Sequence, residues 1–251
     1  MRDNDVRRSL DGGGSTVGLM VFEFGSSGVA RMAHAAGAEF VLYDMEHSGF
    51  SPETVKMLLD SARAVGITPL ARVRDPRRSS VSQILDLGAM GIMVPMVESA
   101  EQAREIVSYA RYAPEGTRGV AVYHADDLEP EGMAATLAKA NREVLVIVQI
   151  ETAAGVEQCE AIAAVPGVDV IWIGHFDLTT SLGAAWGSDP HTAAVDRILA
   201  AAATAGKPAG SLANDVAHGR ELLAQGYRAI AFGDVQVAGA AFSAAMAGIR
   251  A

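Results

Sequence analysis

Short runs of apolar residues alternate with longer amphipathic segments along almost the whole chain. The runs carry Val, Ile and Leu at successive positions, which indicates strands covered on both faces, as in a parallel sheet. The segments between them are typical of crossover helices, so the order of elements favours an α/β protein. We predict eight strands, over residues 17–22, 40–43, 68–73, 91–96, 144–150, 170–174, 208–213 and 229–233.

Two of the predicted helices carry recognisable end signals. Ser51 followed by Pro52 predicts an N-cap with proline at the first helical position, and Gly66 predicts the end of that helix. Ser99, with Gln102 three residues later, predicts a capping box at the start of another helix. Both helices fall between predicted strands, as repeated βα units require.

Eight such units in a chain of 251 residues favour a closed (β/α)8 barrel, the TIM barrel, in a single domain. The alternative is an open doubly wound sheet, whose nucleotide-binding form has GxGxxG after the first strand. Residues 23–28 lack that spacing. We expect the barrel to span residues 16–251. Residues 1–15 are charged and end near three glycines, and we expect them to be a disordered or tag-like leader.

Composition and charge argue against several classes of protein. Half of the residues are apolar, which permits a large core, yet no apolar stretch approaches the ~18 residues of a membrane span. The net charge is −10 and the basic residues form no stripe, so nucleic acid is not an expected partner. The single cysteine, Cys159, suits a reducing compartment. We therefore expect a cytoplasmic protein that acts on small molecules and binds no membrane.

Acidic residues follow two of the predicted strands directly. Glu151 comes after residues 144–150, and Asp177 comes shortly after residues 170–174. The C-terminal ends of barrel strands converge on one mouth, and two carboxylates there are the oxygen ligands that a divalent cation needs. Without a Cys/His cluster they favour Mg²⁺ or Mn²⁺, with Co²⁺ as a further candidate, over structural zinc. We predict that Glu151 and Asp177 hold a metal.

Other polar residues at the strand ends fit the chemistry of a 2-oxo acid. A cation with open positions chelates the carboxylate and keto oxygens of such an acid and stabilises its enolate. Arg72 would neutralise the developing oxyanion, and His47, oriented by Asp44, would carry the proton. Imine chemistry is not expected, because the three lysines lie on two predicted helices and just before the seventh strand.

Five segments carry a family resemblance. They are, in chain order, 42–47 (LYDMEH), 94–97 (VPMV), 118–120 (RGV), 148–152 (VQIET) and 173–178 (IGHFDL). In this order and spacing, which hold from about residue 16 to the end, they resemble the HpcH/HpaI aldolase family of metal-dependent class II pyruvate aldolases. The resemblance implies reversible aldol cleavage of 4-hydroxy-2-oxo acids to pyruvate and an aldehyde through a metal-stabilised enolate.

The resemblance also implies further roles. It supports the roles given above to the acidic pair, the arginine and the His–Asp pair. It adds Gln149 and the backbone of Gly174 as contacts to the pyruvate end, and Leu212 as a wall of the aldehyde pocket. It implies a homo-oligomer, a trimer or hexamer, in which a terminal helix is exchanged between subunits.

Two sites depart from the family pattern. His175 and Phe176 replace smaller residues beside the proposed metal ligand. We treat His175 as a candidate substrate contact or hydrogen-bonding partner of the metal site, with a locally bonded loop histidine as an equal alternative. The segment 121–127, on the aldehyde side in the family, also departs, and its charged residues are more typical of a solvated loop than of substrate contacts.

Two alternative functions stay open. One is a related lyase or synthase acting on citrate-like or acyl-CoA substrates, or an oxaloacetate decarboxylase, with the same metal site. Decarboxylation of oxaloacetate without any aldol product would favour it. The other is a non-catalytic oligomeric barrel, which is less favoured because inactive sites tend to lose charges that are costly to bury. Metal titration by calorimetry separates this last alternative from an enzyme.

Overall fold

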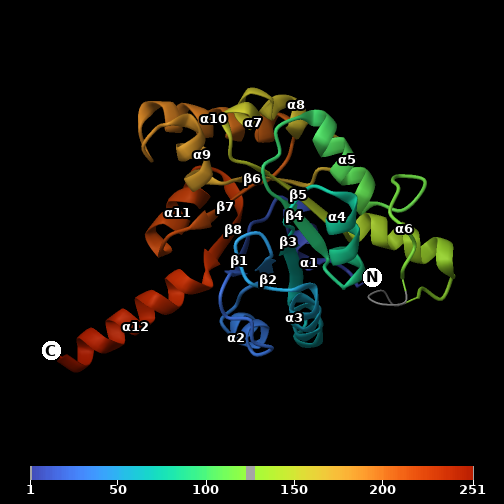
Figure 1. The fold of residues 1–251 in the computed structure, drawn as a ribbon, viewed down its shortest axis with the longest axis horizontal. Coiled ribbons are helices and arrows are strands. Elements are labelled where there is room, and N and C mark those ends of the chain that lie inside the picture. The colour runs from blue at the N-terminus through green and yellow to red at the C-terminus, as the bar shows by residue number, and fades with distance from the viewer. Residues whose placement is uncertain (1, 123–127, 251) are drawn as a thin grey trace.

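A closed barrel of eight parallel strands forms the centre of the molecule (Figure 1). The computed structural model describes residues 2–122 and 128–250. The strands are β1 (Thr16–Val21), β2 (Phe40–Asp44), β3 (Thr68–Arg72), β4 (Gly91–Val94), β5 (Leu145–Ile150), β6 (Val170–Ile173), β7 (Ala209–Ala213) and β8 (Tyr227–Gly233). They pair in chain order and β8 closes onto β1, which confirms the predicted (β/α)8 fold.

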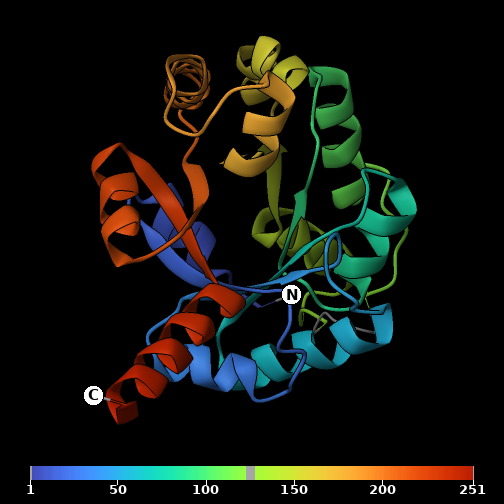
Figure 2. The same ribbon diagram turned by 60° about the vertical axis from the view of Figure 1, so that its left-hand side comes forward.

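Helices follow the strands, and all but the last of those listed here lie around the barrel (Figure 2). They are α2 (Val29–Ala35), α3 (Pro52–Val65), α4 (Arg78–Asp86), α5 (Ala100–Ala110), α6 (Met133–Glu143), α7 (Ala153–Glu157), α8 (Cys159–Ala163), α9 (His175–Leu182), α10 (Asp189–Thr204), α11 (Val216–Ala224) and α12 (Asp234–Arg250). Two helices follow each of β4, β5 and β6, and the extra elements lengthen the loops around the barrel mouth. In the described part of the chain, no helix has the length and apolar character needed to cross a membrane.

The predicted helix ends are largely present. The Ser51 side chain caps α3 by accepting a hydrogen bond from the backbone N–H of Thr54, and Gly66 ends the helix with a left-handed φ of 84°. Ser99 caps α5 by accepting from the N–H of Gln102. The return bond of the capping box is displaced, since the Gln102 side chain accepts from the N–H of Glu98 instead of Ser99.

Two apolar layers stabilise the barrel because successive residues of a strand point to opposite faces. Val41 and Ile171 belong to the outer layer, between strands and helices. Leu42 and Trp172, the next residue in each strand, belong to the inner layer that fills the barrel. The burial of both faces explains why these strands read as continuous apolar runs.

The N-terminal residues differ from the disordered leader that we expected. They form α1 (Asp5–Asp11), which Asn4 caps with its side chain. The Asn4 amide also donates to the carbonyl oxygens of Met90 and Glu143, at 3.0 and 2.9 Å. Val6 and Leu10 are buried in the inner layer. Two apolar residues four positions apart on a charged helix are sufficient to close the N-terminal end of the barrel.

The last helix, α12, leaves the barrel and projects away from it, with the C-terminus at its far end (Figures 1 and 2). In the described part of the chain, Asp234 is its only buried residue. The Asp234 carboxylate accepts hydrogen bonds from the backbone N–H groups of residues 22–24, at 2.9 to 3.0 Å, and so holds the loop after β1. The rest of the helix exposes several large apolar side chains, Val235, Val237, Phe242, Met246 and Ile249.

Candidate active site

A cavity of about 310 Å³ opens at the C-terminal ends of the strands. It collects side chains from residues that are far apart in the sequence. Most of the predicted site residues line it, namely His47, Arg72, Gln149, Gly174, His175, Asp177 and Leu212. Asp44 and Glu151 are buried immediately behind this lining, where both bond to residues that line it or flank it. The mouth of the barrel therefore brings together the residues that the sequence placed at separate strand ends.

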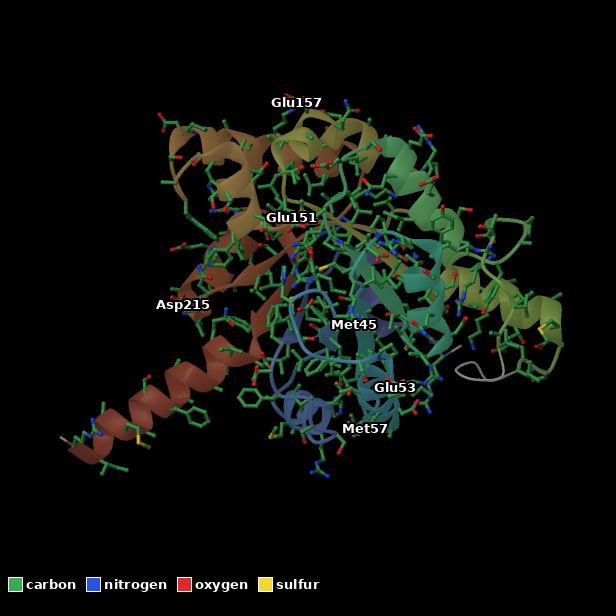
Figure 3. All side chains as sticks on the ribbon, in the orientation of Figure 1. Met45, Glu53, Met57, Glu151, Glu157 and Asp215 are labelled. Atoms are coloured by element: carbon green, nitrogen blue, oxygen red, sulfur yellow. The ribbon has the colours of Figure 1, made fainter. Side chains whose placement is uncertain are left out.

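Glu151 is held in a defined position just beyond β5. One carboxylate oxygen, Oε1, accepts a hydrogen bond from the backbone N–H of Met96 at 2.8 Å, and Oε2 accepts from the Gln149 side-chain amide. Met96 has a left-handed φ of 56°, unusual for a residue with a side chain, and this backbone turn presents its N–H to Glu151. Figure 3 shows Glu151 near the strand ends, whereas Glu157 of α7 lies at the periphery.

Gly174, directly after β6, leaves room for the side chains of Glu151 and Gln149. A Cβ atom placed there would overlap Oε2 of Glu151 and Nε2 of Gln149. Any residue other than glycine would displace the Glu151 carboxylate. Helix α9 begins at the next residue, His175, and Asp177 lies in its first turn. The second carboxylate is therefore at the same mouth of the barrel.

The residues present fit a divalent cation. Burial raises the pKa of Glu151 to about 7, and the neighbouring carboxylates of Asp177 and Glu46 act in the same direction. Such mutual repulsion in a site of low polarity is what a bound cation relieves. Gln149 Oε1 is also buried, with no hydrogen-bond partner among the described residues. Those residues form no cluster of three or more His, Cys, Asp or Glu side chains that could hold a metal. A cation held by two carboxylates would keep other positions for substrate and water.

Arg72 is fixed at the end of β3 by two carboxylates. Its Nε lies 2.6 Å from Asp44 Oδ1 and 3.2 Å from Glu46 Oε2, and its guanidinium lies 5.8 Å from the centre of the Phe22 ring. Nη2 of Arg72 is buried, and no described residue accepts a hydrogen bond from it. Arg72 also lines the cavity, so an anionic oxygen of a bound substrate is a suitable partner for this donor.

His47 is placed differently from our expectation. Asp44 accepts a hydrogen bond from the His47 backbone N–H at 2.8 Å, so it orients the loop and Arg72 and does not support the imidazole. The carboxylate nearest the ring is Glu46, whose Oε2 lies 3.7 Å from Nε2 of His47. Burial raises the pKa of Glu46, while the charges of Arg72 and His47 oppose that rise. The His47 side chain is 58% exposed, which suits a group that exchanges protons with solvent.

His175 is buried in a hydrogen-bonded chain beside the cavity. His191 Nδ1 accepts from the backbone N–H of Gly187 at 3.2 Å, so in the neutral ring Nε2 carries the proton and donates to His175 Nδ1 at 3.1 Å. His175 Nε2 then carries its own proton, 3.4 Å from the hydroxyl oxygen of Tyr227. Burial, with smaller contributions from His191 and His218, lowers the pKa of His175 to about 4. His175 is thus a neutral ring in a fixed orientation. Its contacts are those of a locally hydrogen-bonded histidine, one of the two alternatives that the sequence left open.

Several other polar residues at the strand ends have structural partners. Arg74 donates to the carbonyl oxygens of Met45 and Phe50, at 3.1 and 3.0 Å, as expected for a locally bonded residue. Lys56 pairs with Asp60 within α3, Lys139 of α6 pairs with Glu129 in the preceding loop, and no lysine lines the cavity in the described residues. Of the divergent segment 121–127, residues 123–127 lie outside the described residues.

Sequence reasoning did not find three residues of the site. Glu46 carried a weak signal, because it lies between Asp44 and His47 in the quoted segment. Met96 also lay in a quoted segment, but its left-handed backbone is not visible in the sequence. Trp186 lies in the loop between α9 and α10 and lines the cavity. Its place depends on how two helices pack, and no local pattern indicates it.

Two carboxylates, an arginine and a histidine meet at the mouth of this barrel, and such a set has the groups that metal-assisted stabilisation of an enolate would need. A family model described as HpcH/HpaI aldolase/citrate lyase matches residues 19–239, and the chain belongs to this family. It is 41% identical over 211 residues to a 4-hydroxy-2-oxovalerate aldolase of Novosphingobium aromaticivorans, covering 82% of this chain and 79% of that protein.

Two further comparisons agree with this family. A 2-keto-3-deoxy-L-rhamnonate aldolase of Klebsiella pneumoniae subsp. pneumoniae is 35% identical over 237 residues, covering 92% of this chain and 86% of that protein. The crystal structure of a family member from Burkholderia cenocepacia J2315 superimposes with a TM-score of 0.89 at 32% identity, covering 99% of this chain and all of that one. The similarity therefore extends over the whole barrel.

Proposed function

We propose that this protein is a class II pyruvate aldolase. It reversibly cleaves 4-hydroxy-2-oxo acids to pyruvate and an aldehyde and requires a divalent cation, Mg²⁺, Mn²⁺ or Co²⁺. The observation that carries the proposal is the meeting of Glu151, Asp177 and the unpartnered Nη2 of Arg72 at one mouth. The names of the two aldolases described above support the same reaction class.

Several residues of the chain would each bind a different part of the pyruvate half of the substrate. Glu151 and Asp177 would hold the cation, which supplies Lewis acidity for the enolate when it is bound. Arg72 would donate from Nη2 to the enolate oxygen, with Asp44 keeping the guanidinium in place. Gln149, which bonds to Glu151, would bind the carboxylate of the pyruvate half. Gly174 has no side chain and so leaves room for Gln149.

His47 would move the proton. In cleavage, the proton of the C4 hydroxyl is removed, the C3–C4 bond breaks, and its electron pair enters the pyruvate enolate, which then takes a proton at C3. His47 lines the cavity and faces water, so it can accept the hydroxyl proton and pass it on. Glu46, 3.7 Å from Nε2, would stabilise the imidazolium that forms.

Removal of the cation tests the proposal directly. Protein treated with EDTA should lose cleavage of 4-hydroxy-2-oxo acids and regain it with Mg²⁺, Mn²⁺ or Co²⁺. Glu151→Ala should abolish Mn²⁺ binding in calorimetry, whereas Glu157→Ala, on the exposed face of α7, is the matched control and should bind normally. Full activity in the chelator would contradict the metal role. Oxaloacetate decarboxylation without any aldol product would replace the aldolase with the related decarboxylase.

We further propose that the protein acts as a homo-oligomer in which α12 contacts another copy of the chain. The helix projects from the barrel, and its exposed apolar residues include Phe242 and Ile249, 63% and 82% exposed. A row of large apolar side chains on a projecting helix is costly in water and is typical of an interface. The family resemblance, which implies trimers or hexamers with an exchanged terminal helix, supports a second copy as the partner.

A further inference from the structure

The residues that line the cavity are of two chemical kinds. Arg72, Gln149 and Asp177 suit the acid end of a substrate. Phe176, Trp186 and Leu212 carry no charge, and we call these three residues the apolar side of the cavity. Phe176 and Trp186 are 61% and 40% exposed, although large apolar side chains are normally buried. Two exposed aromatic rings that line the same cavity indicate a surface for a ligand with an apolar group.

Trp186 is fixed by aromatic neighbours from three helices. Its ring centroid lies 4.6 Å from that of His175 and 5.2 Å from that of Phe176, both at the start of α9. It stacks on His191 of α10, at 5.5 Å and 29°, and meets His218 of α11 edge-on at 5.9 Å. A ring that is already fixed loses little conformational entropy when a ligand packs against it. The cluster thus preorganises the apolar side of the cavity.

We propose that Trp186, together with Phe176, selects the aldehyde half of the substrate and favours uncharged aldehydes with an aromatic group. This inference rests on the proposed aldolase function and names the class of its second substrate. An aromatic group would pack against the indole and phenyl rings, where stacked or edge-on contacts add to the burial of apolar surface. Leu212 would bound the same group from β7.

The charges of the cavity disfavour an aldehyde that carries a carboxylate or phosphate. Arg72 is the only arginine or lysine among the cavity-lining residues that the structure describes. It is engaged by Asp44 and Glu46 and serves the pyruvate half. A second anion on the aldehyde would therefore lie against neutral rings without a cation to pair with it. A short polar aldehyde would leave the two rings in contact with water.

The experiment compares cleavage of two substrates that differ only in the aldehyde they release. 4-Hydroxy-2-oxo-4-phenylbutanoate yields benzaldehyde and 4-hydroxy-2-oxohexanoate yields propanal, and the shared pyruvate is followed with lactate dehydrogenase. The wild-type protein should have the higher kcat/KM for the phenyl substrate. In Trp186→Ala and Trp186→Leu the ratio of the two kcat/KM values should fall about 10-fold, the effect of a lost ring contact plus apolar burial. Trp186→Phe should retain most of the preference.

A matched control is Met57→Ala, which removes an exposed apolar side chain from the outer helix α3 (Figure 3). Its substrate ratio should equal that of the wild type. Trp186→Phe and Trp186→Leu keep the test valid if the alanine variant does not fold. An unchanged ratio in both the leucine and alanine variants, or a wild-type preference for the propanal substrate, would overturn the inference.

A separate measurement distinguishes this failure from failure of the proposed function. Wild-type protein loaded with Mn²⁺ should exchange the methyl protons of pyruvate for deuterium without any aldehyde, because that exchange requires only the enolate half. Exchange together with an unchanged substrate ratio overturns the aromatic selection alone. Absence of exchange and of cleavage overturns the aldolase function and this inference with it.

Discussion

Arg72 is a buried charge at the mouth of the barrel that the protein holds on one side. It is 5% exposed, and removing an unpaired guanidinium from water to this depth would cost several kcal/mol. Asp44 and Glu46 offset that cost by binding Nε, which also sets the orientation of the group. Among the described residues, Nη2 has no hydrogen-bond partner. The protein therefore holds one side of the guanidinium, and we propose that the other side binds an anionic oxygen of the substrate.

Substitution of Arg72 should therefore lower turnover without removing the metal. Arg72→Ala loses the proposed donor to the enolate oxygen, and kcat should fall by about 10² to 10³, the typical effect of losing one oxyanion donor. Arg72→Lys should recover little, because one ammonium cannot both replace Nε beside Asp44 and donate at the position of Nη2. Steady-state kinetics measure the loss, and calorimetry with Mn²⁺ should show unchanged affinity. Wild-type turnover in Arg72→Ala would show that Arg72 does not contact the reacting atoms.

Asp44 and His47 lie three residues apart, but substitution of Asp44 should lower the stability of the protein, whereas substitution of His47 should lower its turnover. Asp44 is fully buried and accepts from Arg72 and from the backbone N–H groups of Glu46 and His47. Asp44→Ala leaves the Arg72 charge without its closest partner and should destabilise the protein by about 3 to 5 kcal/mol. His47→Ala removes an exposed ring and should leave stability within about 0.5 kcal/mol while lowering kcat. Urea unfolding and kinetics on the two variants check both; equal loss of stability would contradict these assignments.

The sequence predicted which residues gather at the mouth better than which atoms they bond. Glu151 and Asp177 follow strands and Arg72 ends one, and barrel closure alone brings strand ends together, so their meeting could be predicted. The partner of Asp44 could not, because an Asp three residues before a His reaches either its backbone or its ring, depending on loop geometry. The N–H of Met96 points to Glu151 through a left-handed backbone that the sequence does not encode in any recognised pattern.

At the scale of elements, the packing of α9 against α10 depends on two neutral histidines. His175 opens α9 and His191 lies near the start of α10, and the bond between them requires one ring to donate and the other to accept. Protonation of either ring would turn the acceptor nitrogen into a second donor and place a charge among the rings of Trp186 and Tyr227. Burial lowers the pKa of both histidines, in keeping with this requirement.

Acid should therefore destabilise the protein through His175. Burial lowers its pKa to about 4 in the folded protein, against an ordinary value of about 6.5, so the unfolded chain binds more protons between those values. Its contribution, up to about 3 kcal/mol, is present above about pH 6.5 and is lost as pH falls toward 4. Urea unfolding of metal-free protein at about pH 7 and pH 5 should show a smaller loss in His175→Asn than in the wild type.

The wild type must be compared with His175→Asn because the titration of Glu151 changes the stability with pH in the opposite direction. Its pKa is raised to about 7, so its ionisation destabilises the metal-free fold as pH rises through that value. Both proteins carry Glu151, and the difference between them isolates the histidine. An identical pH dependence in the wild type and His175→Asn would show that the buried histidine does not titrate against folding.

At the scale of the whole molecule, the barrel and the projecting helix differ in how far the sequence determines them. Strand runs and helix caps predicted the order of the eight βα units, and the twist of parallel strands then closes the sheet. The sealing of the barrel floor by α1 was missed because Val6 and Leu10 are only two apolar positions in a charged segment. The direction of α12 could not be predicted, because its large apolar residues are exposed and pack against little of the chain that the structure describes. We propose that another copy of the chain covers them.

The oligomer should depend on the apolar face of α12. In the double variant Phe242→Asp/Met246→Asp, two charges replace apolar side chains that lie four residues apart on one side of the helix. If that face packs against another copy, burying the two carboxylates costs more than the interface gains, and the oligomer should dissociate toward the 26.1 kDa monomer. Light scattering coupled to size-exclusion chromatography measures the mass. The matched control is Met32→Asp on α2, a methionine of the barrel's helical layer that is at least as exposed as Met246, and this variant should keep the wild-type mass. A wild-type protein that elutes as a monomer, or a double variant with unchanged mass, would show that α12 does not hold the copies together.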